Sequence, residues 1–190
     1  MLTSQYLAET KSLQCLEIIG GEPITVEEAK MFLRVDNDDE DTVIENFIAA
    51  ARAQVENKTH RVIRFSTWEW KVSGLSGVCQ VPLTPCAACD GIFVDGQEVD
   101  KALYTFQCGD MSPLFGTITT LDGFPEGEAI VTLKAGYVDG EIPPDIIRWM
   151  QVRLGDFYEQ RESFAVGVHF FEFSRNFVDS LLDPYLIVSI

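Results

Sequence analysis

The spacing of apolar residues changes twice along this chain, and that change restricts the possible folds more than any other feature. Between residues 25 and 59, apolar side chains recur every three or four positions, as at Ile44 and Ile48, which is the period of an amphipathic helix. From Phe65 the period becomes two, which is typical of strands. Helical spacing returns after Pro143. This order predicts an α+β fold, in which a β-rich module is inserted into a small α-helical bundle.

The helices carry recognisable boundary signals. Thr25 is placed as the N-cap of the first helix and Glu28 as its third residue, which together form a capping box. Pro144 suits the first turn of a later helix, because its missing amide hydrogen is not needed there. Asp183-Pro184 is expected to end a short final helix. The predicted helices span residues 25–34, 39–59, 144–160 and about 175–182.

Strand and turn signals fill the middle of the chain. Trp68 and Trp70 alternate with polar residues and therefore lie on one strand face, where aromatic side chains usually belong to the core. Asp95-Gly96, between apolar flanks, predicts a tight β-hairpin. Further strands are expected over residues 78–83, 92–94, 104–107, 118–121 and 130–135.

These elements define the expected domain organisation. We expect an N-terminal segment over residues 1–24, a helical core built from 25–64 and 136–190, and an inserted β module over 65–135.

Net charge excludes several classes of partner. The formal charge is −16 and the isoelectric point is near 4.3, which argues against a broad surface for nucleic acid phosphates or anionic lipid. No apolar run is long enough to span a bilayer, and the first residues lack the pattern of a secretory signal. Five cysteines, an odd number, fit reduced thiols better than a disulfide framework. We therefore expect synthesis in a cytoplasm.

An acidic turn separates the first two predicted helices. Its spacing resembles the start of a calcium loop, but the sixth position holds Asp41 in place of Gly and the twelfth holds Phe47 in place of Glu. We interpret the turn as a solvated helix-capping segment. Its candidate residues are Asp36, Asp38, Asp39, Glu40 and Asp41.

Residue patterns for catalysis or metal binding are weak. Cys86 and Cys89 have the spacing of a metal or redox pair, but Pro85 and the following Asp90-Gly91 place them in a loop, and no second such pair exists. Only two histidines occur, and there is no phosphate-binding glycine loop or nucleophile elbow. We therefore expect no enzyme activity, no catalytic or metal site and no cofactor.

Apolar residues near the C-terminus have no obvious partner within one chain. Such segments often mark contacts between subunits. The candidate interface residues are Phe170, Phe171, Phe173, Phe177, Tyr185, Leu186 and Ile187.

Two long stretches of the chain resemble a known family. The first opens with Pro23-Ile24-Thr25-Val26-Glu27-Glu28-Ala29 and continues to residue 63; the second runs from Gly136-Tyr137, through Ile142-Pro143-Pro144-Asp145, to Leu181-Leu182-Asp183-Pro184-Tyr185. In this order they resemble the head–tail connector (adaptor) proteins of long-tailed bacteriophages and gene-transfer particles. Residues 65–135 then correspond to the β insertion of the larger branch of that family.

The resemblance implies a structural role in virion assembly. The expected assembly is a homo-oligomeric ring of about twelve subunits, located in the neck of the particle between the portal protein and a stopper or tail-completion protein. Genomic DNA would pass through its lumen without sequence-specific binding, and no membrane is involved. The resemblance makes the acidic turn a candidate for the lumen as well as for solvent, and the C-terminal apolar residues candidates for contact with the portal or a neighbouring subunit. The alternative is an acidic monomer that inhibits a nucleic-acid enzyme by mimicking DNA. An enzyme, as a further rival, would need a pocket lined by Cys86, Cys89 or His60.

Overall fold

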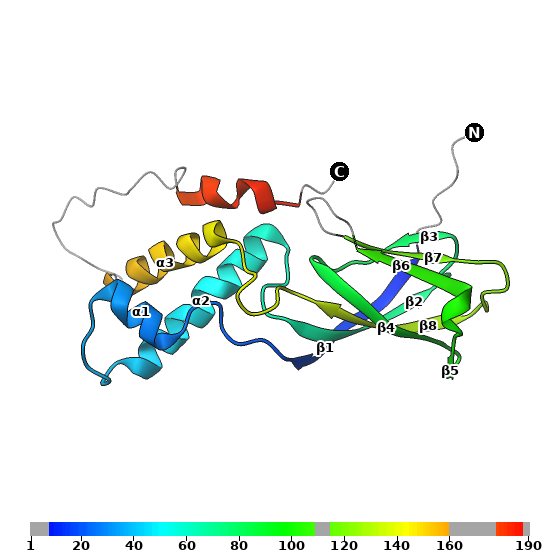
Figure 1. The fold of residues 1–190 in the computed structure, drawn as a ribbon, viewed down its shortest axis with the longest axis horizontal. Helices are drawn as coiled ribbons and strands as arrows, with labels where there is room; N and C mark the ends of the chain where they lie inside the picture. The colour runs from blue at the N-terminus through cyan, green and yellow to red at the C-terminus, as the bar shows by residue number, and fades with distance from the viewer. Residues whose placement is uncertain (1–7, 109–114, 160–177, 188–190) are drawn as a thin grey trace. The chain divides into compact units, whose positions relative to one another are not determined.

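The computed structural model describes residues 8–108, 115–159 and 178–187, and it contains both helices and sheets, which confirms the α+β class (Figure 1). The chain divides into two units. The β unit comprises residues up to Gly20 together with Arg64–Val138, and the helical unit comprises Gly21–Ile63 together with the chain from Asp139 onward. The elements are β1 (Glu9–Ile18), α1 (Val26–Leu33), α2 (Asp41–Thr59), β2 (Ser66–Ser73), β3 (Val78–Gln80), β4 (Cys86–Val94), β5 (Gln97–Glu98), η1 (Lys101–Leu103), β6 (Tyr104–Cys108), β7 (Gly116–Thr120), β8 (Glu128–Ala135), α3 (Pro144–Glu159) and η2 (Ser180–Tyr185), where η denotes a 3₁₀ helix.

The helical unit follows the predicted helices closely. The capping box of α1 is present: the Thr25 hydroxyl accepts from the Glu28 amide at 3.2 Å, and the Glu28 carboxylate accepts from the Thr25 amide at 2.9 Å. α3 begins at Pro144 as expected. The apolar stripe of α2 is buried, and α1, α3 and η2 pack against it. The largest fully buried side chains of this unit are Ile24, Ile44, Ile63, Ile146, Trp149, Met150, Leu154 and Leu182.

The predicted end of the final helix is wrong. Its described part is helical at residues 178–179 and continues as a 3₁₀ helix through Pro184 to Tyr185, rather than stopping at Asp183-Pro184. A proline keeps a backbone angle compatible with a 3₁₀ turn, and the Leu186 amide still closes the end by donating to the Asp183 carbonyl. Residues 175–177, where this helix was expected to start, lie outside the described residues.

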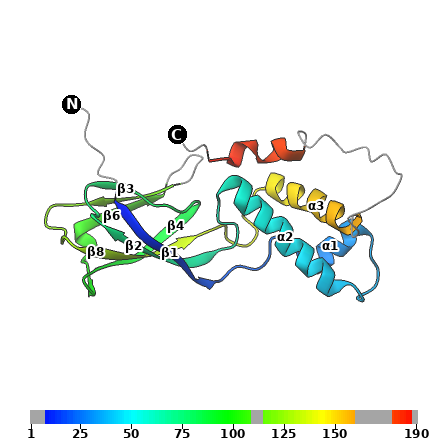
Figure 2. The same cartoon turned by 180° about the vertical axis from the view of Figure 1, so that it is seen from behind.

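The β unit consists of two antiparallel sheets in the described residues. One has the strand order β1-β2-β8-β4-β5 and the other β3-β7-β6 (Figures 1 and 2). Alternate residues of β8, from Ala129 to Ala135, are at most 1% exposed, so one face of the larger sheet carries the core. Trp70 shares that face and is buried, while Trp68 is half-buried, which confirms that these two indoles pack inward.

The Asp95-Gly96 hairpin is confirmed. Both residues have positive φ angles, 49° and 81°, as a type I′ turn requires, and they join β4 to β5.

The structure adds a strand in the segment left unassigned before residue 25. β1 pairs antiparallel with β2 along its length, with two register irregularities, and forms an edge of the five-stranded sheet. Its exposed apolar side chains, Leu16 and Ile18, are each about half accessible. Apolar and polar residues do not alternate regularly along β1, because the irregularity between Cys15 and Glu17 breaks the two-residue period. The sequence pattern therefore did not indicate a strand here.

The loop predicted for Cys86 to Cys89 is wrong. Both residues lie in β4, paired with β8, and two further register irregularities accommodate the segment. Pro85 precedes the strand and Gly91 lies within it at an irregularity, so these residues mark a strand start and a bulge rather than a loop.

Candidate assembly surfaces

The acidic turn between α1 and α2 is held by one lysine and one tyrosine. Lys30 donates to the carboxylates of Asp38 and of Asp41, the latter at 2.9 Å. The hydrogen bond to Lys30 lowers the pKa of Asp38, and the same contacts raise the pKa of Lys30. Glu40 accepts from the Tyr158 hydroxyl of α3 at 2.6 Å. These contacts hold the turn in place within the helical unit. The sequence contained no signal for its contact with α3.

The remaining carboxylates of this turn face outward. Asp36 and Asp39 are exposed, and so is Asp38 beside its lysine. Among the residues that the structure describes, no group of His, Cys, Asp or Glu is arranged to hold a metal ion. The turn offers negative charge at a surface, as the sequence suggested, and the choice between solvent and lumen stays a prediction.

At the start of the C-terminal 3₁₀ helix, one carboxylate accepts three hydrogen bonds from α2 and α3. Asp179 accepts from the indole of Trp149 at 3.0 Å, from Arg153 at 3.0 Å and from Lys58 at 3.1 Å. Burial by itself would raise the pKa of Asp179, but the hydrogen bonds from Trp149, Lys58 and Arg153 outweigh it and lower the pKa. We call these four residues the Asp179 hub. Sequence reasoning missed it, because its members lie up to 121 residues apart.

Beyond the Asp179 hub, the chain end is held by Arg61. Its guanidinium donates to the Tyr185 carbonyl at 2.8 Å and lies 5.8 Å from the centre of the Tyr185 ring. Leu182 is buried beneath this segment, whereas Leu186 is 42% exposed and Ile187 is half-buried. Of the candidate interface residues, Tyr185 is thus partly used within its own unit, and Leu186 is the more accessible. Phe170, Phe171, Phe173 and Phe177 lie outside the described residues.

A groove of about 490 Å³ lies between α1 and the start of α3. Met31 and Phe32 contribute apolar surface to it and are 74% and 37% exposed. The Arg148 guanidinium lies 5.6 Å from the Phe32 ring centre. Exposed apolar side chains beside a shallow groove are suited to contact with another protein.

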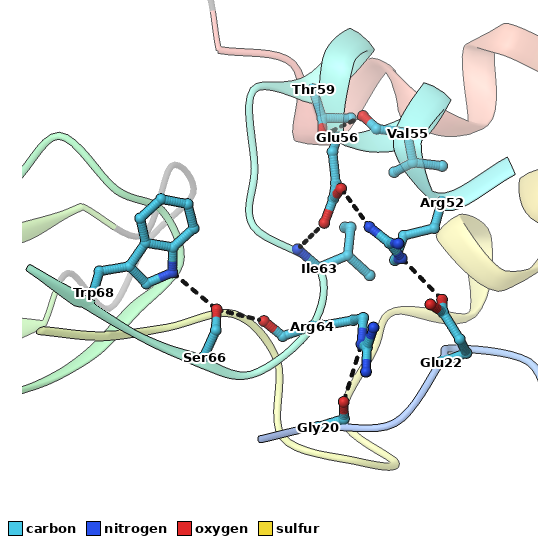
Figure 3. Close-up of polar contacts among 10 residues, drawn as sticks. All are labelled: Gly20, Glu22, Arg52, Val55, Glu56, Thr59, Ile63, Arg64, Ser66 and Trp68. Atoms are coloured by element: carbon cyan, nitrogen blue, oxygen red, sulfur yellow. Dashed lines mark hydrogen bonds and ion pairs between the residues drawn. The ribbon is translucent and has the colours of Figure 1, made fainter. Parts of the chain in front are cut away.

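Polar networks form around two of the boundaries between the units, at residues 20–21 and 63–64 (Figure 3). In the helical unit, Arg52 donates to Glu22 and to Glu56, each at 2.8 Å, and Glu56 also accepts from the Ile63 amide at 3.2 Å. Burial opposes the charge of Arg52, but its two carboxylate partners raise its pKa overall. Only the Arg52–Glu56 pair, four residues apart on α2, had a signal in the sequence.

In the β unit, the corresponding network uses backbone oxygens. Arg64 donates to the Gly20 carbonyl at 3.0 Å, Ser66 donates to the Arg64 carbonyl at 3.0 Å, and the Trp68 indole donates to the Ser66 hydroxyl at 2.8 Å (Figure 3). Gly136 packs against the same backbone: a Cβ there would lie 2.3 Å from the Arg64 carbonyl oxygen, and its φ is 102°. Only glycine fits at this approach.

The thiols of β4 are shielded from solvent. Burial raises the pKa of Cys86 to about 12 and that of Cys89 to about 11, so both are protonated near neutral pH, the opposite of a catalytic or metal-binding thiolate. All five cysteines are thiols in the structure. No helix in the described part of the chain is long and apolar enough to cross a membrane.

Comparison with known proteins bears on these surfaces. The family model described as "Phage gp6-like head-tail connector protein" matches residues 23–99. The match therefore includes β2 to β5, a region that the sequence resemblance did not cover. A search of curated protein sequences found no match.

Solved structures share the fold over nearly the whole chain. A chain of the "Neck of empty GTA particle computed with C6 symmetry" is 19% identical with a TM-score of 0.72, and the alignment covers 94% of this chain and 97% of that one. A chain of the "Virion of native gene transfer agent (GTA) particle" is 17% identical with a TM-score of 0.74, covering 94% and 96%. A chain of the "Neck of native GTA particle computed with C12 symmetry" is 17% identical with a TM-score of 0.69, covering 94% and 97%.

The resemblance to head–tail connector proteins predicted from the sequence is confirmed by the family match over residues 23–99. The fold is shared with chains of the gene-transfer-agent neck and virion structures. The descriptions of these similar proteins name structural parts of particles, a connector and a neck.

Proposed function

We propose that this protein is a structural adaptor that forms a closed ring between the portal and a stopper or tail-completion protein of a tailed phage or gene-transfer particle. The observation that carries the proposal is the connector-family match over residues 23–99 combined with a shared fold over 94% of the chain. The relatives solved with C6 and C12 symmetry support a ring of about twelve copies. Such a ring uses heterologous contacts, in which two different surfaces of each subunit meet.

The charge distribution supports passage of DNA through the ring. At least seven lysines and arginines of the described residues make ion pairs with carboxylates of the same chain, for example Lys30, Arg52 and Arg153. Their positive charge is thus largely satisfied internally, while a large excess of acidic residues remains. An acidic lining of the ring would repel the phosphates of DNA. DNA could then slide through, because no lysine or arginine would bind a phosphate and release its counterions as the DNA moves.

Leu186 is the accessible residue of the described C-terminal segment, and we assign it to the portal contact. Removing everything after Asp183 would also remove the Tyr185 contacts with Arg61, so truncation mixes folding with docking. The substitution Leu186→Glu avoids this, since the side chain is 42% exposed. Leu121→Glu is its matched control, because Leu121 is 46% exposed and lies in the β unit.

The test is co-assembly with portal-containing, tailless particles, imaged at the vertex by electron microscopy. The wild-type protein and Leu121→Glu should add a collar of density below the portal, and symmetry analysis of that collar gives the copy number. Leu186→Glu should fold normally by circular dichroism and add no collar. A vertex unchanged by the wild-type protein would contradict the connector role and favour the acidic inhibitor of a nucleic-acid enzyme. A normal collar with Leu186→Glu would remove Leu186 from the portal contact.

A further inference from the structure

Two cysteines from different sheets of the β unit lie close to each other, because the Cys108 sulfur contacts the residue that follows Cys86. Cys86 is the first residue of β4 in the larger sheet, and Cys108 is the last residue of β6 in the smaller one. They are 22 positions apart and do not form the Cys-x-x-Cys motif that the sequence presents. The fold brings them together because β4 contacts both β6 and β7.

Strand register shows where the Cys108 side chain is directed. Cys108 pairs with Gly116 of β7, and residues opposite each other in an antiparallel pair project from the same face. A Cβ placed on Gly116 would lie 3.2 Å from the Cβ of Cys86. The face of β6 and β7 that carries Cys108 is therefore turned toward Cys86.

A direct contact supports this placement. The Cys108 sulfur donates to the carbonyl oxygen of Ala87, the residue after Cys86, at 3.1 Å. Cys86 is 2% exposed, whereas Cys108 is exposed. One thiol is thus accessible to a reagent from solvent, and the second lies behind it.

The Cys-x-x-Cys pair is less suited to bond formation. Cys86 and Cys89 lie on one strand, and their β8 partners are Ala135 and Leu133. At ~3.3 Å per strand residue, two to three residues separate their Cα atoms by roughly 7–10 Å, at or beyond the limit of about 7 Å for a disulfide. Closing this pair would require β4 to leave its ladder with β8.

We propose that Cys86 and Cys108 form an intramolecular disulfide when the protein meets a small-molecule disulfide oxidant. Cys108, as its thiolate, attacks one sulfur of glutathione disulfide and releases one glutathione, leaving a mixed disulfide on Cys108. Cys86 then attacks the Cys108 sulfur and breaks the bond to glutathione; the proton that Cys86 gives up is taken by the departing glutathione thiolate. Overall, two protein thiols and one glutathione disulfide give one protein disulfide and two glutathione thiols.

The bond would link the two sheets of the β unit. A chain made in a reducing cytoplasm would stay in the dithiol form and acquire the link after release into an oxidising medium. This use rests on the proposed function as a particle component, whereas formation of the bond does not. The test below uses purified protein without particles, so its failure leaves the connector role untouched.

The experiment treats the full-length protein with glutathione disulfide, blocks the remaining thiols with iodoacetamide and maps cross-linked peptides by mass spectrometry. The expected product is a Cys86–Cys108 peptide with a loss of about 2 Da relative to the dithiol. Cys108→Ser, at an exposed position, should abolish it, and Cys89→Ser should leave it unchanged. The oxidised wild type should unfold roughly 5 °C or more above its reduced form, a shift absent in Cys108→Ser.

Three results would overturn the proposal. A Cys86–Cys89 peptide would show that the sequence motif forms the bond. A stable glutathione adduct on Cys108, or a dimer linked through Cys108, would show that Cys86 cannot reach the mixed disulfide. Recovery of both residues fully alkylated after prolonged oxidation would show that neither reacts.

Discussion

The two units of this protein hold their elements together by different interactions. In the helical unit, the last element, η2, combines a buried apolar residue, Leu182, with charged contacts: the Asp179 carboxylate receives three donors, and Arg61 binds Tyr185. In the β unit, β8 is bound on both sides by neighbouring strands and buries every second side chain. Charged contacts weaken on protonation and with screening by salt, whereas apolar burial does not depend on protonation. Both units have an apolar core, but the attachment of η2 should respond to pH more than the β8 ladder does.

The largest effect is expected from the apolar core of the β unit. Leu133 of β8 is fully buried, so Leu133→Ala should lower the free energy of unfolding of this unit by about 2–5 kcal/mol through lost transfer energy and a residual cavity. Hydrogen exchange read peptide by peptide checks it, with faster exchange expected in β2, β4 and β8. Leu121→Ala, at a half-exposed site, is the control. A loss below about 1 kcal/mol for Leu133→Ala would mean that the β unit is not held by this core.

A smaller effect is expected at the Asp179 hub. Asp179→Asn keeps the shape but removes the charge that three donors share, which should cost the helical unit about 1–3 kcal/mol. Denaturant unfolding followed by helical circular dichroism measures it, and Asp36→Asn, at an exposed carboxylate, should change stability little. If both variants behave alike, the hub contributes nothing specific.

The same carboxylate gives the helical unit its pH dependence. The folded pKa of Asp179 is lowered, so its stabilising effect is fully present above the ordinary Asp value of about 3.9 and is lost as pH falls through the lower folded value. Acid titration of the wild type should therefore loosen η2 before the β sheets. Asp179→Asn should lack that step.

The smallest effect concerns the start of α1. Thr25→Ala removes the hydroxyl that accepts from the Glu28 amide and should cost about 1 kcal/mol, within the range of about 0.5–2 kcal/mol for N-caps. Thermal unfolding of the helical unit measures it. Thr25→Ser, which keeps the cap, should restore most of the loss, and its failure to do so would assign the effect to the lost methyl group.

Local signals explain why much of the fold was predictable. The Thr25 capping box and the Asp95-Gly96 hairpin depend on residues at most three positions apart, and such interactions are the same in a peptide and in a folded chain. The resemblance to connector proteins also rests on contiguous stretches. The family match through residue 99 extended it into the strands β2 to β5, which the resemblance had not covered.

The failures come from interactions between distant residues. Pro85 and Asp90-Gly91 favour a loop locally, but pairing with β8 over Cys86–Val94 gives enough backbone hydrogen bonds and burial to override that preference. β1 became a strand because β2 offered it an edge, although its own apolar pattern is irregular.

The sequence by itself determined the α+β class, the helical and strand periods, the main caps and turns, and the likeness to head–tail connectors. The first three follow from composition and short-range spacing, and the likeness rests on contiguous stretches that resemble a known family. Only the tertiary structure decided which charges meet at Asp179, that Cys108 lies beside the Cys86–Ala87 segment, and that β1 closes one edge of the larger sheet. These pairings join residues tens of positions apart, and they exist only once folding has brought the segments together.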